Sequence, residues 1–167
     1  QRIYINGESI REEELDIRLE SHRRLIYDMV LNNDSSIVDG KGIGDPTEYA
    51  LIESSRHIGL DENLIRDVLS REEEVPFDSD RKLMTTVNVV DGKKLVIVKG
   101  AVDMMIPRCT NGADEIAAAK AANDEMSASA LRVLAIATKV IDELPAELTS
   151  ETLECELRLI GLVGMID

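Results

Sequence analysis

The chain has 167 residues, of which 44% are apolar, 2% are aromatic and 31% are charged, and its formal net charge is −14 at pH 7. This length predicts a single domain over residues 1–167, with a core built from aliphatic side chains. The negative charge repels phosphate polymers and anionic lipid headgroups, which argues against nucleic-acid binding and against direct membrane contact.

The first quarter of the chain predicts one hairpin and one helical segment. Residues 1–10 predict a short strand or hairpin, with a turn at Asn6-Gly7. Residues 12–32 carry apolar side chains at helical spacing, which fits one helix or two. Residues 33–44 are polar and glycine-rich, so we expect a loop there.

Clear start and stop signals delimit the next helix. Asp45 is a favourable N-cap residue, Pro46 suits the first helical position, and Glu48 would complete a capping box. Gly59 is expected to end this helix. A second short helix is expected over residues 61–71.

The clearest hairpin signal is the stretch LMTTVNVVDGKKLVIVKGA. Two runs rich in β-branched residues flank Asp91-Gly92, a dipeptide that favours a type I′ turn. A short helix broken by proline is expected over residues 101–108. A longer alanine-rich helix is expected over residues 113–130.

Two strands are expected near the end of the chain. The stretch LRVLAIATKVI, residues 131–141, is apolar with β-branched members and predicts a strand buried on both faces. The stretch TLECELRLIGLVGMI, residues 152–166, alternates through its leucines and predicts another strand. Because the order of elements is not a regular βαβ alternation, we predict an α+β fold with a largely antiparallel, twisted sheet flanked by helices.

One aromatic residue stands out in the stretch PFDSDRK, residues 76–82. Phe77 is the only phenylalanine of a chain that has no tryptophan, and charged residues surround it. A ring among charges suits a ligand that is flat at one end and anionic at the other, because bases stack on aromatic rings. The alternative is that this ring anchors the loop at 78–81 to the core.

Four short stretches together resemble the nucleotide-binding domain of a P-type cation-transporting ATPase, and most of all its bacterial calcium-pump subgroup. They are GDPTE at 44–48, PFDSDRK at 76–82, KGA at 99–101 and LRVLAIA at 131–137. The final GLVGMID resembles the return of the chain into the family's phosphorylation domain. The family's phosphorylated aspartate lies in a DKTGT motif, which this sequence lacks. The resemblance therefore implies a domain excised from a larger membrane pump, which binds ATP and has no catalytic residue of its own.

The resemblance also implies which residues contact the nucleotide. No GxxxxGK[ST] or GxGxxG loop is present to cradle phosphates, so the base must be gripped instead. Phe77 would stack on adenine, Glu48 would accept from its amine, and Lys99 would lie deep beside it. Arg132 would reach the phosphate chain. The full set of ligand-binding residues implied is Thr47, Glu48, Phe77, Lys82, Met84, Lys99, Gly100, Ala101, Arg132 and Leu134.

Each polar member of this set also has an explanation without a ligand. Glu48 could serve only the capping box. Lys99 could be a solvated lysine at a strand end, with Gly100 in a turn. Arg132, a charge within an apolar strand, could pair with Glu48 or with Asp45.

One position departs from the family pattern. Some calcium pumps carry an arginine two residues after the phenylalanine, and this chain has Ser79 there. Either Arg81 takes over its contact with the phosphates, or the site holds them more loosely.

The implied cofactor is ATP, accompanied by Mg²⁺ that is held mainly through the phosphorylation domain. The implied partners are ATP or ADP and the phosphorylation and actuator domains of the same pump, with this domain monomeric at the cytoplasmic side of the cell membrane. We expect no metal site, and Cys109 and Cys155 as buried reduced thiols. Two alternatives remain: an acidic protein-interaction module that binds no nucleotide, and the same domain from a sodium, potassium or proton pump.

Overall fold

The computed structural model describes residues 1–166. The strands are β1 (Arg2–Ile5), β2 (Glu8–Arg11), β3 (Ser36–Val38), β4 (Lys41–Ile43), β5 (Arg71–Asp78), β6 (Leu83–Val90), β7 (Lys93–Gly100), β8 (Arg132–Ile141) and β9 (Arg158–Met165). The helices are α1 (Glu20–Leu31), α2 (Pro46–His57), α3 (Glu62–Val68), α4 (Val102–Met105), α5 (Ala113–Ala128) and α6 (Ser150–Leu153), with 3-10 turns at Glu12–Glu14 and Ile106–Arg108.

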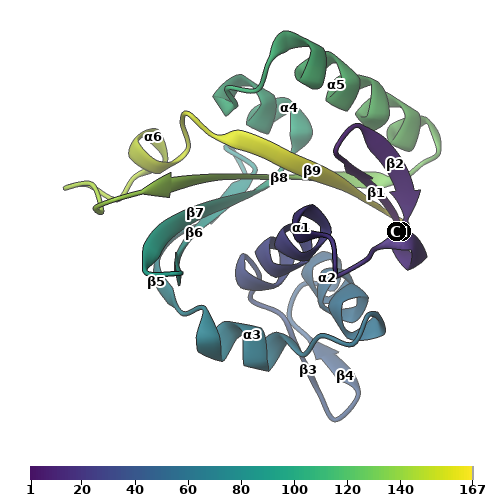
Figure 1. Ribbon diagram of the computed structural model, residues 1–167, viewed down its shortest axis with the longest axis horizontal. Helices are drawn as coiled ribbons and strands as arrows, with labels where there is room; N and C mark the ends of the chain where they lie inside the picture. The colour runs from purple at the N-terminus through teal and green to yellow at the C-terminus, as the bar shows by residue number, and fades with distance from the viewer. Residues whose placement is uncertain (167) are drawn as a thin grey trace.

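Seven of these strands form one sheet in the order β2-β1-β9-β8-β7-β6-β5, and every neighbouring pair is antiparallel. Strands β3 and β4 form a separate two-stranded ribbon. Helices cover both faces of the large sheet, as Figure 1 shows. The predicted α+β class with an antiparallel sheet is confirmed.

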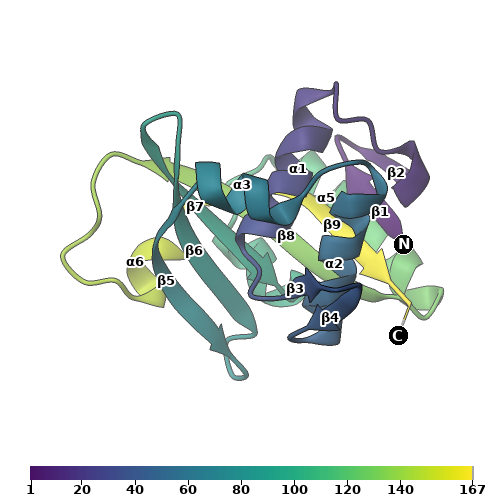
Figure 2. The ribbon, with the colours of Figure 1, turned by 90° about the horizontal axis from the view of Figure 1, so that it is seen from below.

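The helices divide into two groups, and each group covers its own hydrophobic cluster. Helices α1, α2 and α3 lie on one face of the sheet, while α4 and α5 lie on the other (Figures 1 and 2). Strand β7 serves both: Leu95 and Ile97 join the first cluster, and Val96 and Val98 join the second. Because successive strand residues face opposite sides, a strand covered on both faces is apolar throughout.

The first and last strands of the chain are neighbours in the sheet. Arg2 of β1 pairs with Gly164 of β9. Figure 2 accordingly shows the two labelled ends close together, at one end of the molecule.

The two expected hairpins are confirmed. Asn6-Gly7 joins β1 to β2, and Asp91-Gly92 joins β6 to β7. All four residues have a positive φ, between 52° and 77°. A type I′ turn requires positive φ at both central positions, which asparagine, aspartate and glycine tolerate best.

Several boundaries differ from the predictions. The expected loop at 33–44 contains the β3–β4 ribbon, because Asp39-Gly40 makes another two-residue turn with φ of 52° and 74°. The expected strand at 152–166 begins only at Arg158. Its first part forms α6 instead, since Thr149 caps that helix through the backbone N–H of Thr152.

The helical segment expected at 12–32 is a 3-10 turn followed by α1. Strand β8 is fully buried only over residues 135–138. Cys109 and Cys155 are free thiols, but they are half-buried and not buried as expected, since Cys109 follows the 3-10 turn after α4 and Cys155 follows the end of α6.

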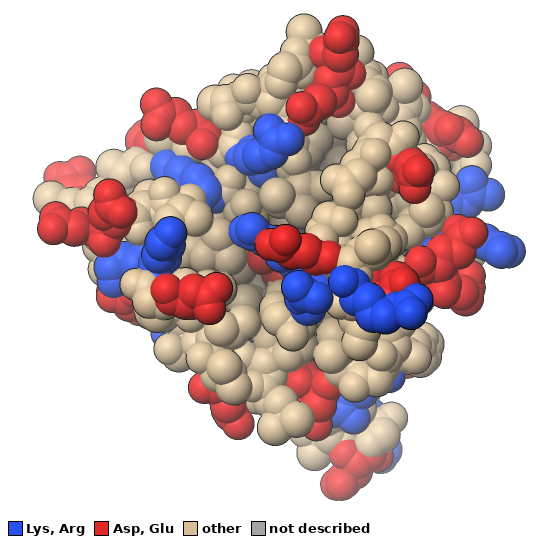
Figure 3. Space-filling model, viewed as in Figure 1, with Lys and Arg blue, Asp and Glu red and all other residues tan. Residues whose placement is uncertain are grey.

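Acidic and basic side chains are interspersed over the face shown in Figure 3, and the basic ones do not gather into one large patch. Across residues 1–166, no helix combines the length and the apolar character needed to cross a bilayer. Within the same residues, no group of three or more His, Cys, Asp or Glu side chains is arranged to hold a metal ion.

Candidate functional site

The ten residues singled out from the sequence converge on one end of the sheet. In the β6–β7 register, Met84 lies opposite Lys99 and Leu83 lies opposite Gly100. Strand β5 ends beside this point and β8 begins there, since Asp78 pairs with Leu83 and Gly100 pairs with Ala135. Eight of the ten residues lie in these strand ends or directly beside them: Phe77, Lys82, Met84, Lys99, Gly100, Ala101, Arg132 and Leu134. Thr47 and Glu48 lie in the first turn of α2.

At the centre of this region, a buried lysine of a strand pairs with a half-buried glutamate of a helix. Lys99 of β7 is only 5% exposed, and its Nζ donates to the backbone oxygen of Asn32 at 2.5 Å. The same Nζ lies 3.6 Å from Oε1 of Glu48. Burial lowers the pKa of Lys99, and the Glu48 carboxylate opposes that shift. A buried ammonium needs such partners, because an unpaired buried cation is costly.

Glu48 does not form the capping box expected from the sequence. Asp45 caps α2 as predicted, since its carboxylate accepts from the backbone N–H groups of Thr47 at 2.8 Å and Glu48 at 3.4 Å. The Glu48 carboxylate turns toward Lys99, and its Oε2 accepts from the backbone N–H of Asp34 at 2.5 Å. The buried ammonium of Lys99 attracts the Glu48 carboxylate more strongly than the exposed backbone N–H of Asp45, which a capping box would use. This difference explains the orientation of Glu48.

Two asparagines that the sequence analysis did not assign to the site hold its frame together. Asn32 is buried at the end of α1, and its Nδ2 donates to the backbone oxygens of Met84 at 3.0 Å and Ile97 at 2.8 Å. Asn33 donates through Nδ2 to the backbone oxygen of Glu48 at 2.9 Å. The available signal was the stretch LNND, in which two amides directly follow an apolar helix.

Two arginines from other elements bind the segment that follows α1, residues 31–35. Arg71 of β5 lies 2.7 Å from Oδ1 of Asp34 and donates to the backbone oxygen of Leu31 at 2.9 Å. Arg66 of α3 donates to the backbone oxygen of Ser35 at 2.7 Å. The backbone N–H that Asp34 offers to Glu48 is therefore held in place by contacts with two separate elements.

A second link joins β8 to α2. Arg132 begins β8, is exposed, and donates from Nη1 to Oγ1 of Thr47 at 2.8 Å. The sequence suggested Glu48 or Asp45 as its protein partner. The structure shows Thr47 in contact with it, because the arginine stands at the start of its strand, where it reaches the first turn of α2.

Phe77 is 60% exposed, so the alternative in which its ring anchors the following loop to the core is wrong. That loop is held by Asp78, whose Oδ1 accepts from the backbone N–H groups of Asp80 at 2.7 Å and Arg81 at 3.3 Å. These hydrogen bonds lower the pKa of Asp78. Lys82 ends the turn with a φ of 60° and an exposed side chain.

Arg81 is engaged in a structural contact. Its Nε donates to Oε1 of Glu154 at 2.6 Å, and the other carboxylate oxygen accepts from Oγ1 of Thr85 at 2.5 Å. The Glu154 side chain is completely buried, so the guanidinium neutralises a charge that would otherwise be costly. Arg81 therefore serves the fold, while Lys82 is an exposed cation of this turn.

Gly100 is required by its neighbours in the fold. A Cβ atom there would lie 2.1 Å from the backbone oxygen of Lys82 and 2.8 Å from a methyl carbon of Leu83. The same backbone oxygen accepts from the N–H of Ala101 at 3.2 Å. Of the apolar residues in the set, Met84 is buried, and the half-buried Leu134 packs against the cluster under α1–α3.

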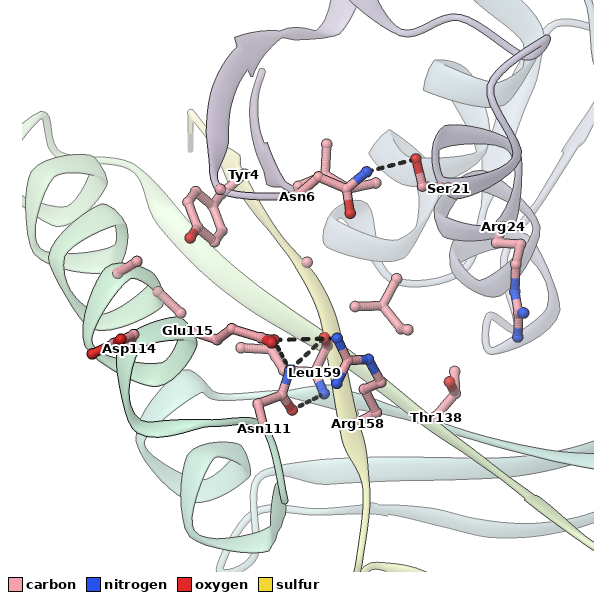
Figure 4. Close-up of a pocket in the computed structure, with 16 residues that line it drawn as sticks. Tyr4, Asn6, Ser21, Arg24, Asn111, Asp114, Glu115, Thr138, Arg158 and Leu159 are labelled. Atoms are coloured by element: carbon pink, nitrogen blue, oxygen red, sulfur yellow. Dashed lines mark hydrogen bonds and ion pairs between the residues drawn. The ribbon is translucent and has the colours of Figure 1, made fainter.

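A cavity of about 690 Å³ lies elsewhere, between the β1–β2 turn, α5 and β9 (Figure 4). Within it, the Asn111 side chain accepts from the backbone N–H of Leu159 at 2.7 Å and donates to its backbone oxygen at 3.3 Å. Arg158 lies 3.2 Å from Glu115. None of the ten residues lines this cavity, so it is distinct from the candidate site.

The antiparallel sheet covered by helices on both faces agrees with what comparison of the sequence shows. The profile of the family described as P-type ATPase, cytoplasmic domain N, matches residues 21–167. The chain therefore belongs to this family, as the resemblance of its four short stretches predicted.

Its relatives include bacterial calcium-transporting ATPases. One from Listeria monocytogenes is 44% identical over 161 residues, which cover 89% of this chain and 18% of that protein. One from Lactococcus lactis is 41% identical over 163 residues, which cover 91% of this chain and 18% of that protein. One from Bacillus cereus is 38% identical over 165 residues, which cover 93% of this chain and 18% of that protein. The chain thus spans about a fifth of the length of these relatives.

Proposed function

We propose that this domain binds ATP by its adenine end and presents the γ-phosphate to an aspartate of a separate phosphorylation domain. The observation that carries this proposal is the exposed ring of Phe77, close in the strand register to the buried Lys99, whose ammonium pairs with the half-buried Glu48 of α2. A flat apolar surface beside a carboxylate and an ammonium suits a purine, because the ring can stack and the exocyclic amine can donate.

Each polar residue has a defined role in this proposal. The ring of Phe77 stacks on adenine, Glu48 accepts from the amine, and Lys99 orients that carboxylate. Arg132 and Lys82 are exposed cations and attract the phosphates. Mg²⁺ arrives with the ATP and is held mainly by the phosphorylation domain.

The expected affinity is modest. Stacking contributes about 1–3 kcal/mol, one amine hydrogen bond about 1 kcal/mol, and charge contacts a further 1–3 kcal/mol or so. Association entropy offsets much of this sum. The dissociation constant should lie between roughly 10 μM and a few mM. Arg81 is held by Glu154 and is not available to replace the arginine absent at Ser79, which favours the weaker end of this range.

The wider assignment also rests on the comparisons. We propose that the chain is one domain of an ATP-hydrolysing cation pump, with phosphorylation and actuator domains as partners and a position at the cytoplasmic side of the cell membrane. Calcium is the favoured ion because three relatives carry that name. A pump for sodium, potassium or protons is the alternative.

The first prediction tests nucleotide binding directly. Titrating isotope-labelled protein with ATP should shift the backbone amide resonances of Phe77, Lys99 and Gly100 in a saturable way. Phe77→Ala should remove most of the response, because the stacking surface is lost. Val68→Ala removes another exposed apolar side chain, on α3, and should leave the titration unchanged. An amide spectrum that does not move at several mM ATP contradicts the proposal.

The competing hypothesis is an acidic interaction module that binds no nucleotide. It predicts a salt-sensitive contact with a protein partner and no ATP response, so the same titration separates the two. The convergence of the predicted residues at one end of the sheet favours the nucleotide.

A further inference from the structure

A second cavity lies between α1 and the turn of the β6–β7 hairpin, with a volume of about 360 Å³. It is at the Val90–Lys93 end of the hairpin, whereas the candidate nucleotide site is at the Leu83–Gly100 end. Its apolar lining includes Leu31, Leu95 and Val140. The two sites can therefore be tested independently.

One buried residue that lines this cavity has a carboxylate oxygen without a hydrogen-bond partner in the part of the chain that the structure describes. Asp28 of α1 is 2% exposed, lines the cavity, and its Oδ2 has no hydrogen-bond partner among residues 1–166. Burial raises the pKa of Asp28 to about 7, against the opposing effect of the nearby Arg24. An ionised carboxylate in these surroundings is costly unless a donor reaches it.

The rest of the lining carries charges of both signs. Three basic side chains, Arg23, Arg24 and Lys93, accompany two acidic ones, Glu20 and Asp91. Arg23 already donates to the backbone oxygen of Ile17 at 2.9 Å. With Asp28 ionised the lining is neutral in sum, so a ligand that itself carries both charges adds no net charge to it.

We propose that this cavity binds a small aliphatic zwitterion of amino-acid size, with its ammonium group on Asp28. The aliphatic body would pack on Leu95 and Val140, and the anionic end would lie near the basic residues, among them Lys93. The ammonium supplies the donor that Oδ2 lacks. A volume of this size falls in the range of small-molecule sites.

The test uses probes that differ in one charge. The 167-residue chain with labelled methyl groups and carboxyl carbons is titrated at about pH 8 with 6-aminohexanoate, hexylamine or hexanoate. We expect 6-aminohexanoate to shift the Asp28 carboxyl carbon and the Leu95 and Val140 methyls at millimolar concentration. The other two should bind severalfold more weakly. At about pH 6 the affinity should fall about tenfold, because only about a tenth of the Asp28 carboxyl is then ionised.

Three variants complete the design. Asp28→Asn keeps the shape and should abolish the response, whereas Asp114→Asn removes an exposed carboxylate outside the cavity and should not affect it. Lys93→Ala should weaken the binding of 6-aminohexanoate, because the carboxylate loses a cation, and should leave the binding of hexylamine unchanged. The proposal is overturned if no probe shifts these resonances at tens of millimolar, if hexanoate or hexylamine binds as well as 6-aminohexanoate, or if Asp28→Asn binds normally.

Discussion

Asp28 makes the stability of this domain depend on pH in an unusual direction. Most carboxyl groups of folded proteins have a lowered pKa, so their contribution is lost in acid. Burial raises the pKa of Asp28 to about 7, so the folded state binds a proton that the unfolded state releases near pH 4. Its contribution is therefore complete below about pH 4 and is lost as the pH rises through about 7.

Replacing this residue should reveal the effect. Asp28→Asn should raise the free energy of unfolding at about pH 8, by an amount approaching roughly 4 kcal/mol, since each pKa unit corresponds to about 1.4 kcal/mol. At about pH 4 the gain should nearly vanish, because Asp28 is then protonated in the folded protein and only partly ionised in the unfolded chain. Urea unfolding at the two pH values measures the difference. An equal gain at both values would show that the carboxylate is not the cause.

At the scale of single residues, the sequence singled out a set of residues that the fold brings to one end of the sheet, but it did not predict their contacts. Phe77 stood out because it is the only phenylalanine and lies among charges, and the structure leaves it exposed. The direction of the Glu48 carboxylate was not predictable. It depends on Lys99, which is 51 residues away in sequence and comes close only because the fold brings the end of β7 to the first turn of α2.

Among the elements, α2 brings residues of the candidate site together through its N-terminus. Asp45 satisfies two backbone N–H groups of the first turn, and that turn carries Thr47 and Glu48. Local capping chemistry is enough to predict such a start.

Removing this cap should affect both stability and binding. Asp45→Ala should lower the free energy of unfolding by about 1 kcal/mol. It should also lower the affinity for ATP, because the turn that presents Glu48 frays. Asp61 caps α3 by accepting from the backbone N–H of Asn63 at 2.8 Å. Asp61→Ala should therefore lower stability similarly and leave ATP affinity unchanged. Equal loss of ATP affinity in both variants would argue against a special role for α2.

Turn chemistry explains both the successes and the omissions among the strands. Asn6-Gly7 and Asp91-Gly92 predicted their hairpins correctly. Asp39-Gly40 has the same chemistry but was missed, because strands of three residues leave no visible alternation beside the turn. The segment at 152–157 alternates like a strand, yet the Thr149 cap makes its first part a helix.

Across the whole molecule, the net charge of −14 opposes the compact state. Basic residues are interspersed among the acidic ones in Figure 3, but they are too few to neutralise them. Added salt should therefore stabilise the fold by screening repulsion.

Thermal unfolding at two ionic strengths tests this. Raising sodium chloride from about 0.02 M to about 0.3 M should raise the Tm, by roughly 2–4 °C for each kcal/mol gained. Sodium sulfate matched in ionic strength is a useful control for ion-specific effects. A Tm that falls with salt would mean that attractive pairs such as Arg81–Glu154 outweigh the repulsion.

The sequence alone determined the starts of α2 and α3, the Asn6-Gly7 and Asp91-Gly92 turns, the aliphatic core and the family, because these depend on residues close together in the chain or on short ordered motifs. Only the tertiary structure decided the strand order, the partners of Lys99, Arg81 and Arg132, and the burial of Asp28. Those features depend on which distant segments pack together, and a buried charge takes its partner from whatever the fold brings within reach.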